Sequence, residues 1–244
     1  SKVQVVGLGS GTTIRGQTPD YHLVIGEKDI LPEDIEMLTH ELNLKETTPT
    51  TLEALHRSFG NDWFNAFKKM NTNGRIKDEE GKSIPAPGSV DEWATESGVN
   101  VMAAEGLRSK LGRVFDRSYI MENPAANTLK EIITALQKGR HIVLSFGNFE
   151  TDLDYLLVTN LITRRIREEW EKMTDEFRSK KGTEPRPLAI VVEEAHKLLN
   201  REMAFQTTFS TIARELRKYY VTLLVIDQRP SQIYDEVMSQ LGTR

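Results

Sequence analysis

The feature that most constrains the fold of this chain is a short apolar run, residues 188–192, that ends directly in Glu193 and Glu194. Uninterrupted apolar, β-branched runs are typical of strands that a parallel sheet buries on both faces. Carboxylates at the end of such a strand need a cation or water, because an unpaired buried charge is prohibitively costly. Mg²⁺ with a bound phosphate is the usual cation. The run therefore predicts a parallel sheet with a metal-assisted site at its carboxyl edge.

The two glutamates can serve different purposes, because consecutive strand residues project to opposite sides. We expect Glu193 to hold a hydrated Mg²⁺, and Glu194 to orient or deprotonate the water that attacks a γ-phosphate. A second apolar run, residues 221–226, ends before Asp227 and Gln228, and Gln228 is the candidate sensor of that phosphate. Acidic pairs after strands also cap helices, since Glu near a helix N-terminus interacts favourably with the helix dipole. The pair alone leaves both readings open.

The longer pattern is more specific. The strand ending Glu-Glu-Ala-His is followed by Ile-Ala-Arg-Glu-Leu-Arg-Lys at residues 212–218, and then by a strand ending Asp-Gln-Arg-Pro-Ser at residues 227–231. This pattern resembles the HerA-like branch of the HerA/FtsK family of hexameric ATPases, whose carboxylate strand reads EEAH or DEAH and whose next strand ends SQRPS. Asp227 stands where that family usually has Ser. His196, with no second His at ligand spacing, is expected to be a structural hydrogen-bonding group.

The resemblance implies a RecA-like P-loop NTPase core of α/β class with an inserted helical subdomain. It also implies the ATPase motor of a DNA translocase or helicase, with ATP and Mg²⁺ as cofactors, double-stranded DNA as partner, a homo-hexamer, and a nuclease partner in DNA-end processing. A ring ATPase needs a cation from the neighbouring subunit during phosphoryl transfer. By its match to the family's R-K-[FY] stretch, Arg217 is the expected trans arginine finger and Arg214 the second candidate. An ordinary exposed arginine is the alternative.

The glycines of residues 1–16 do not form a phosphate loop. A Walker A loop needs G-x-x-x-x-G-K-[ST], whose Lys reaches the phosphates and whose hydroxyl binds Mg²⁺, and no Gly-Lys-[Ser/Thr] occurs in these residues. We expect a turn-rich loop there. Since proteins of the resembled family carry a small barrel and the Walker A segment before the matching region, the chain is expected to be a fragment or a degenerate paralogue that hydrolyses ATP poorly by itself.

Two other functions stay open. One is an ATPase of conjugation or secretion machinery from the same superfamily, which usually ends its carboxylate strand in Asp-Glu, so EEAH favours the HerA-like reading. The other is a pseudo-ATPase without a P-loop that serves as a structural scaffold. A Gly-Lys-[Ser/Thr] upstream in the intact gene would favour the motor over the scaffold.

The order of the predicted elements indicates three segments. Residues 1–31 are an incomplete N-terminal part of the ATPase core, residues 32–140 a helical insertion, and residues 141–244 the α/β core with the Walker B and sensor strands. In the last segment, strand and helix alternate, which predicts a parallel sheet with right-handed crossovers. Its expected elements include a strand at residues 141–146 and a helix that carries residues 212–218. Between them, an apolar stripe from Leu153 to Phe177 predicts a long helix, whose other face carries mixed charges that suit solvent or a neighbouring subunit.

In the helical insertion, Pro32 and Ser89 are expected to begin helices, Ser89 with Glu92 as a capping box, and Asn127 is expected to cap another helix. In residues 71–87, Gly, Pro and polar residues predict a surface loop.

Composition limits the alternatives further. The chain has 244 residues, 38% of them hydrophobic, which is enough for a substantial core. It has no cysteine, so disulfides and thiolate metal sites are excluded, and its net charge of -4 argues against a basic nucleic-acid coat over the whole surface. No apolar run approaches the length of a membrane span and no signal peptide opens the chain, so we expect a soluble, cytoplasmic protein.

Two clusters in the helical insertion have both a structural and a functional reading. Trp63, Phe64 and Phe67 fall at helical spacing, which favours a core over a base-stacking platform. The second cluster is basic, and it is either a solvated helix face or a set of contacts to DNA phosphates. Its members are Arg108, Lys110, Arg113 and Arg117.

Overall fold

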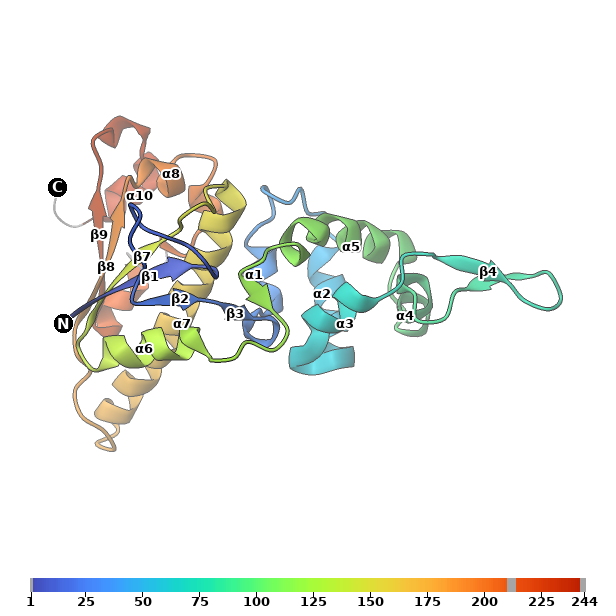
Figure 1. Cartoon of the computed structure of the whole chain (residues 1–244), viewed down its shortest axis with the longest axis horizontal. Helices are drawn as coiled ribbons and strands as arrows, with labels where there is room; N and C mark the ends of the chain where they lie inside the picture. Colours follow the sequence, from blue (N-terminus) through green and yellow to red (C-terminus); the bar gives the residue numbers. More distant parts are fainter. Residues whose placement is uncertain (1, 210–213, 242–244) are drawn as a thin grey trace. The chain divides into compact units, whose positions relative to one another are not determined.

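A computed structural model of the chain describes residues 2–209 and 214–241, and Figure 1 shows it coloured along the sequence. The chain divides into two compact units, Ser1–Leu23 with Asn127–Arg244, and Val24–Ala126. We call the first the sheet unit and the second the helical unit. The sequence analysis placed its domain limits at 31/32 and 140/141, and that division stays a prediction.

The first sheet of the sheet unit has three parallel strands. β1 (Val3–Leu8) lies between β2 (Tyr21–Leu23) and β7 (His141–Ser145) and is hydrogen-bonded to both. The apolar run at residues 141–146 is thus a strand, as predicted. Parallel strands need crossover connections, and here the crossover from β1 to β7 contains the whole helical unit.

The second sheet carries the glutamate pair. β8 (Leu188–Glu193) pairs with β9 (Val221–Ile226) in parallel, with Glu193 opposite Ile226 at the carboxyl end. Parallel strands joined by helices confirm the α/β class. Among the described residues, hydrogen bonds do not join β7 to β8, so the RecA-like order of one continuous sheet stays a proposal.

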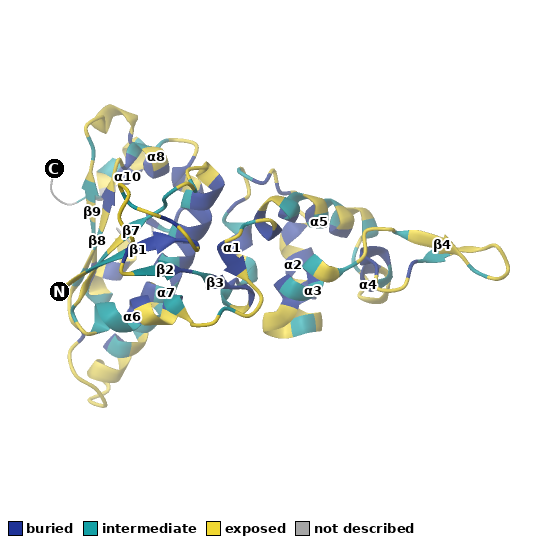
Figure 2. Cartoon of the chain, in the orientation of Figure 1, coloured by how far each residue is buried: buried dark blue, intermediate teal, exposed yellow. Residues whose placement is uncertain are grey.

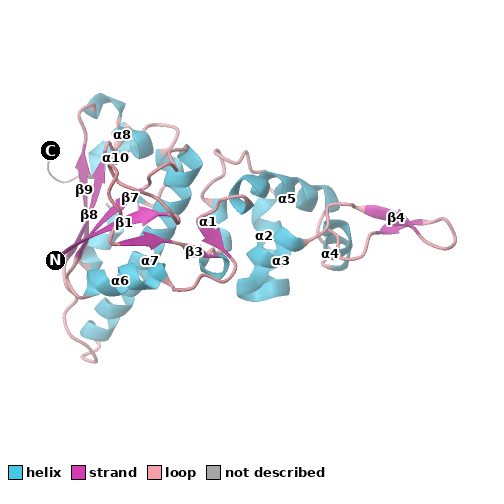
Figure 3. Ribbon diagram, viewed as in Figure 1, coloured by secondary structure: helices cyan, strands magenta, loops and turns pink. Residues whose placement is uncertain are grey.

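Four described α-helices belong to the sheet unit, and Figure 3 distinguishes them from the strands. They are α6 (Thr128–Gln137), α7 (Asp152–Arg178), α8 (His196–Leu199) and α10 (Asp235–Gln240). The predicted long helix is α7. Most of its stripe at helical spacing is buried, including Leu157, Leu161 and Trp170, but Phe177 at the end of the stripe is exposed. The Oδ1 atom of Asn127 accepts the backbone N–H of Lys130, which confirms the predicted cap of α6.

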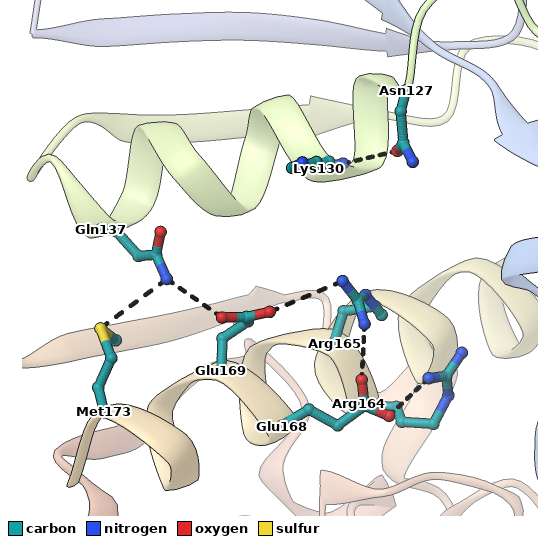
Figure 4. A network of polar contacts seen from close by, with 8 residues as sticks. All are labelled: Asn127, Lys130, Gln137, Arg164, Arg165, Glu168, Glu169 and Met173. Atoms are coloured by element: carbon teal, nitrogen blue, oxygen red, sulfur yellow. Dashed lines mark hydrogen bonds and ion pairs between the residues drawn. The ribbon is translucent and has the colours of Figure 1, made fainter. Parts of the chain in front are cut away.

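Helices α6 and α7 lie against each other and share a polar network (Figure 4). Arg164 and Arg165 each donate to Glu168, at 2.7 and 2.8 Å. Arg165 also lies 3.8 Å from Glu169, which accepts from Gln137 of α6 at 3.5 Å. The mixed charges of α7 that the sequence analysis assigned to solvent or a neighbouring subunit therefore have an intramolecular use.

One face of β8 and β9 is open among the described residues, as the light colours of these strands in Figure 2 indicate. The exposed fractions are 50% for Val191, 51% for Leu224 and 47% for Ile226, and the register places Val191 opposite Leu224. Val192, which projects to the other side, is buried. The expectation that residues 188–192 are buried on both faces is therefore wrong for this structure, because no described element covers the second face.

The helical unit contains five α-helices and two small strand pairs in its described residues. They are α1 (Pro32–Glu36), α2 (Thr48–Phe59), α3 (Trp63–Lys69), α4 (Val90–Glu96), α5 (Val101–Phe115), parallel β3 (Ile25–Gly26) with β6 (Ile120–Met121), and antiparallel β4 (Arg75–Lys77) with β5 (Ser83–Pro85). The predicted surface loop at 71–87 is thus partly a hairpin (Figure 1). Its strands are too short and too exposed to leave a strand signal in the sequence.

The aromatic cluster of the helical unit is its core. Trp63, Phe64 and Phe67 have no exposed surface, and Phe64 packs edge-on against Phe115 with ring centroids 4.9 Å apart. The Trp63 indole N–H donates to the Ile30 carbonyl at 2.9 Å. This confirms the core prediction, because rings without exposed surface offer no platform for a base.

Most of the basic cluster makes contacts within the same unit. Arg113 donates to both the carbonyl and the carboxylate of Glu41, and Lys110 donates to the Asn43 carbonyl. Arg108 donates to the Lys68 carbonyl at 2.6 Å. These contacts fasten α5 to neighbouring segments and favour the structural reading of the cluster.

Candidate functional site

The glutamate pair lies at the carboxyl edge of the β8–β9 sheet. The register ends with Glu193 opposite Ile226, so the next residues along the two strands, Glu194 and Asp227, leave the sheet at the same level. Glu193 and Ile226 share the open face described above, and both are exposed. The predicted meeting of the two strand ends is therefore present in the structure.

Glu194 adopts a backbone conformation that is rare for a residue with a side chain. Its φ is 51°, in the left-handed region, and its side chain is 53% exposed. For a residue other than glycine this conformation costs on the order of 1–3 kcal/mol and persists where the surroundings fix it. The chain turns sharply here, and α8 begins two residues later at His196.

Asp227 fixes this turn from the neighbouring strand. Its side chain is only 2% exposed. Its Oδ2 accepts the backbone N–H of His196 at 2.7 Å and lies 2.8 Å from the His196 Nδ1, while Oδ1 accepts the backbone N–H of Arg229. An ionised carboxylate can only accept hydrogen bonds, so Nδ1 of His196 carries a proton. His196 is thus a structural hydrogen-bonding group, as expected.

These contacts also decide the charge of Asp227. Burial by itself raises the pKa of a carboxyl, but the N–H groups of His196 and Arg229 and the His196 ring outweigh it, so the pKa of Asp227 lies below its usual value. Asp227 is therefore an anion at neutral pH. Nδ1 of His196 also lies 3.8 Å from the Glu194 carboxylate, between the two acids.

The other predicted site residues lie on both edges of the sheet. Gln228 is exposed and directly follows Asp227 at the carboxyl edge. Arg217 is exposed in the short 3-10 helix Leu216–Tyr219 that precedes β9, so it lies at the amino edge. The six residues of β9 separate the two edges, roughly 17 Å for five steps at about 3.3 Å per residue. The structure thus brings Gln228, but not Arg217, to the glutamates of its own chain.

Arg214 precedes Arg217 by three residues. It directly follows residues 210–213, which include Ile212 and Ala213 of the predicted helix and fall outside the described residues. Its guanidinium is 3.7 Å from the Glu236 carboxylate, and both side chains are exposed. Exposed pairs of this kind contribute little to stability. The pair places Arg214 next to α10.

The comparisons with known proteins agree with the geometry. No family model matches the chain. The DNA double-strand break repair helicase HerA of Pyrococcus furiosus is 34% identical over 152 residues, which are 59% of this chain and 26% of that protein. The helicases of the same name from Saccharolobus solfataricus and Sulfolobus acidocaldarius are 31% and 26% identical, over 48% and 61% of this chain and 23% and 30% of their own.

These relatives support a HerA-like family for the chain. The chain spans between 23% and 30% of the length of these relatives. The family was the one indicated by the EEAH and DQRPS strings, so the resemblance seen in the sequence is confirmed. Within residues 2–209 and 214–241, no helix combines the length and apolar character that a membrane crossing needs.

The acidic edge of the HerA-like chain fits a metal that is held mostly by other ligands. In the described part of the chain, no three His, Asp or Glu side chains gather into a ligand set. Mg²⁺ does not require one, because it keeps several waters and is bound through one or two carboxylates plus substrate phosphates. The exposed carboxylate of Glu193 at the strand end is suited to that arrangement.

Two glycine segments of the HerA-like chain resemble phosphate loops in composition only. After β1 the chain turns at Gly9 and Gly11, both with positive φ, and no helix follows before β2. Gly81-Lys82-Ser83, a triplet that the sequence analysis did not consider, lies at the end of the β4–β5 hairpin. A phosphate loop joins a strand to a helix, and neither segment does.

The Asp227–His196 contact is the feature that sequence reasoning missed. In the sequence pattern Asp227 is only a departure from Ser, and His196 has no identifiable partner. Asp227 follows the end of one strand, and His196 lies three residues after the end of the neighbouring strand. This spacing predicts a contact only once the pairing of the two strands is known. A parallel register of residues 188–193 with 221–226 would have been enough to find it.

Proposed function

We propose that this chain forms the catalytic-carboxylate part of the ATPase motor of a HerA-like DNA translocase. The observation that carries the proposal is the carboxyl edge of β8 and β9, where Glu193, Glu194 and Gln228 meet on the strand ends. Ligands of open α/β sheets bind outside the carboxyl ends of the strands. The relatives named as repair helicases support the same reading.

In this proposal the residues divide the work of phosphoryl transfer to water. Glu193 would hold Mg²⁺ through water, and the bound ion would supply positive charge to the phosphates. Glu194 accepts a proton from the water as its oxygen bonds to the γ-phosphorus; the bond from that phosphorus to the β–γ bridging oxygen breaks, and ADP and phosphate leave. Gln228 contacts the γ-phosphate while it is present. The exposed Glu194 carboxylate can reach a substrate from solution.

Arg217 acts in this proposal on the site of another copy. Its place at the amino edge, roughly 17 Å of strand from the glutamates, excludes a contact within its own sheet and suits a subunit boundary. A cation supplied in trans stabilises the charge of the transition state. Arg214, paired with Glu236, is the second candidate.

The partners of the whole protein follow from the same proposal. They are double-stranded DNA, five further copies in a ring, and a nuclease in DNA-end processing. An ATPase of conjugation or secretion machinery is the nearest alternative, and a scaffold without hydrolysis is the alternative of another class. The names of the relatives favour the repair helicase.

The first test measures DNA-stimulated ATP hydrolysis by the full-length gene product beside this chain of 244 residues. Glu194→Gln keeps the size of the side chain and removes the proton acceptor, so ATP binding should persist. Turnover should fall by roughly a hundredfold or more, since a hundredfold is about the lower end of what acid–base catalysis contributes. Glu202→Gln, the same change at an exposed residue, is the control. Unchanged turnover in Glu194→Gln would exclude the role of Glu194, and a folded, assembled wild type without turnover would favour the scaffold.

The second test concerns Arg217. Arg217→Ala should abolish hydrolysis in the assembled ring without changing ATP binding, because the lost cation acts only in the transition state. Lys218→Ala removes a charge from the next residue, whose ammonium lies over the Tyr219 ring, and should hydrolyse ATP normally. In mixed rings, Arg217→Ala subunits should restore activity to Glu194→Gln subunits at shared boundaries. Normal hydrolysis by Arg217→Ala rings would remove the assignment.

A further inference from the structure

The carboxylate of Asp227 makes three hydrogen bonds across the carboxyl edge of the sheet. Two of them, to the backbone N–H and the ring Nδ1 of His196, reach the turn that follows β8. The third, from the backbone N–H of Arg229, stays on the segment that follows β9. One buried side chain thus joins the segment that carries Glu194 to the segment that carries Gln228.

The turn after β8 needs such support. Glu194 has a positive φ, and the backbone N–H of Ala195 lies 3.4 Å from the Ile226 carbonyl, a long hydrogen bond. The bond from His196 N to Asp227, at 2.7 Å, is the short one in this turn. A strained conformation persists only where its surroundings over-determine it, and Asp227 supplies the stronger of these restraints.

We propose that Asp227 is a positioning residue that sets the direction of the Glu194 carboxylate and couples it to Gln228. The inference rests on the proposed function, since it gives Asp227 a part in the same hydrolysis. Asp227 touches no substrate in this proposal: it acts through His196 and Arg229. The contact makes the proton acceptor and the γ-phosphate sensor one rigid element rather than two adjacent loops.

The chemistry of the side chain explains why an aspartate suits this place. A carboxylate offers two oxygens and about four lone-pair directions, so it can accept all three N–H groups at once. Asn offers one acceptor oxygen, and its NH₂ group would face a donor. Ser has a single oxygen, which can serve one segment but cannot span both. Hydrogen bonds to a charged acceptor are also roughly twice as strong as neutral ones.

The experiment compares Asp227→Asn, Asp227→Ser, His196→Ala and the double variant Asp227→Ser/His196→Ala. Asp78→Asn is the matched control, because Asp78 also accepts two backbone N–H groups in a turn, from Glu80 and Lys82, but belongs to the helical unit. Two quantities are measured. One is the hydrogen-exchange rate of the His196 and Arg229 amides in this chain, and the other is kcat and KM for ATP in the full-length protein.

We expect amide exchange at positions 196 and 229 to become at least tenfold faster in Asp227→Ser while the amides in the middle of β8 stay protected. We expect kcat to fall roughly ten- to a hundredfold with KM for ATP little changed, because displacing a reacting group by about 1 Å can cost a hundredfold. The double variant should be no slower than Asp227→Ser, since the pair acts as one unit. Asp78→Asn should leave kcat and both exchange rates unchanged.

The two proposals fail in different ways. If the wild type hydrolyses ATP and Asp227→Ser keeps its kcat, the positioning role is overturned while the proposed function stands. If exchange at residues 196 and 229 is unchanged in Asp227→Ser, the restraint itself is absent and the inference is overturned whatever the activity. A fall in kcat that is matched by equally faster exchange throughout the sheet would also overturn it, because a general loss of stability would then be the cause.

Discussion

Replacing Glu194 with glycine should make the folded chain more stable while removing its proposed catalytic group. Glu194 has a φ of 51° and an exposed side chain, so it has conformational strain to lose and few packing contacts. Placing an L-residue in the left-handed region costs about 1–2 kcal/mol, and the greater freedom of glycine in the unfolded chain takes back about 0.5–1 kcal/mol. The expected net gain is about 0.5–1 kcal/mol.

The reference for this gain is Glu194→Ala, which also removes the carboxylate but keeps a Cβ. The two variants have the same charge, so the difference between them isolates the backbone. In urea unfolding of this chain, with a slope of about 2 kcal/mol per molar, the midpoint of Glu194→Gly should lie about 0.25–0.5 M above that of Glu194→Ala. Lys180→Gly against Lys180→Ala is the positive control, because Lys180 has a φ of 58° beyond the end of α7.

The result that refutes this reasoning is a Glu194→Gly midpoint equal to or below that of Glu194→Ala, with the Lys180 pair showing the expected gain. The turn would then not be strained at residue 194. A gain at both positions would instead mean that the sequence keeps a glutamate where glycine folds better. Strain retained at an exposed carboxylate is typical of a residue kept for function.

Two further predictions concern the stability of the sheet unit. The folded state holds the pKa of Asp227 below its usual 3.8. The contribution of Asp227 to the free energy of unfolding is therefore complete above about pH 5, and it is lost as the pH falls through the lower pKa of the folded state. Urea midpoints measured at decreasing pH should show this loss in the wild type and not in Asp227→Asn. Asn160 is buried, and its side-chain amide donates to the Gln206 carbonyl at 2.6 Å and accepts the Thr208 N–H at 3.2 Å. Asn160→Ala should lower the free energy of unfolding by about 2–4 kcal/mol, because both backbone groups lose this partner. A loss below about 1 kcal/mol would show that water replaces the amide.

The elements that sequence reasoning predicted well are those that local rules determine. α7 is 27 residues long and buries an apolar stripe from Leu153 to Trp170, and such a stripe fixes both the helix and its buried face. The Ser89 hydroxyl accepts the N–H of Glu92, as the capping pattern required. These features depend on neighbours within a few positions, so one sequence is sufficient to find them.

The elements that sequence reasoning missed depend on contacts between residues far apart in the chain. The β4–β5 hairpin has strands of three residues. They are too short to show the alternation of apolar and polar residues over four or more positions that identifies a strand. The predicted helix from Pro32 onward ends at Glu36, and the chain continues in turns, although Leu38 and Leu42 remain buried. At the site, the residue types and the edge were predictable, but the left-handed backbone of Glu194 was not. The contact that we propose to hold it joins His196 to Asp227, 31 positions apart.

The open face of β8 and β9 combines a feature that local sequence predicts with one that depends on distant contacts. The runs of both strands are apolar at successive positions, a pattern that parallel sheets show when they are covered on both sides, yet Val191, Leu224 and Ile226 remain about half exposed among the described residues. Exposed apolar side chains in one patch are typical of surfaces that another segment or subunit covers. Glu193 ends the same face. A cover for these three side chains would therefore also approach the metal-binding carboxylate that we propose, and would exclude water from the place where it acts.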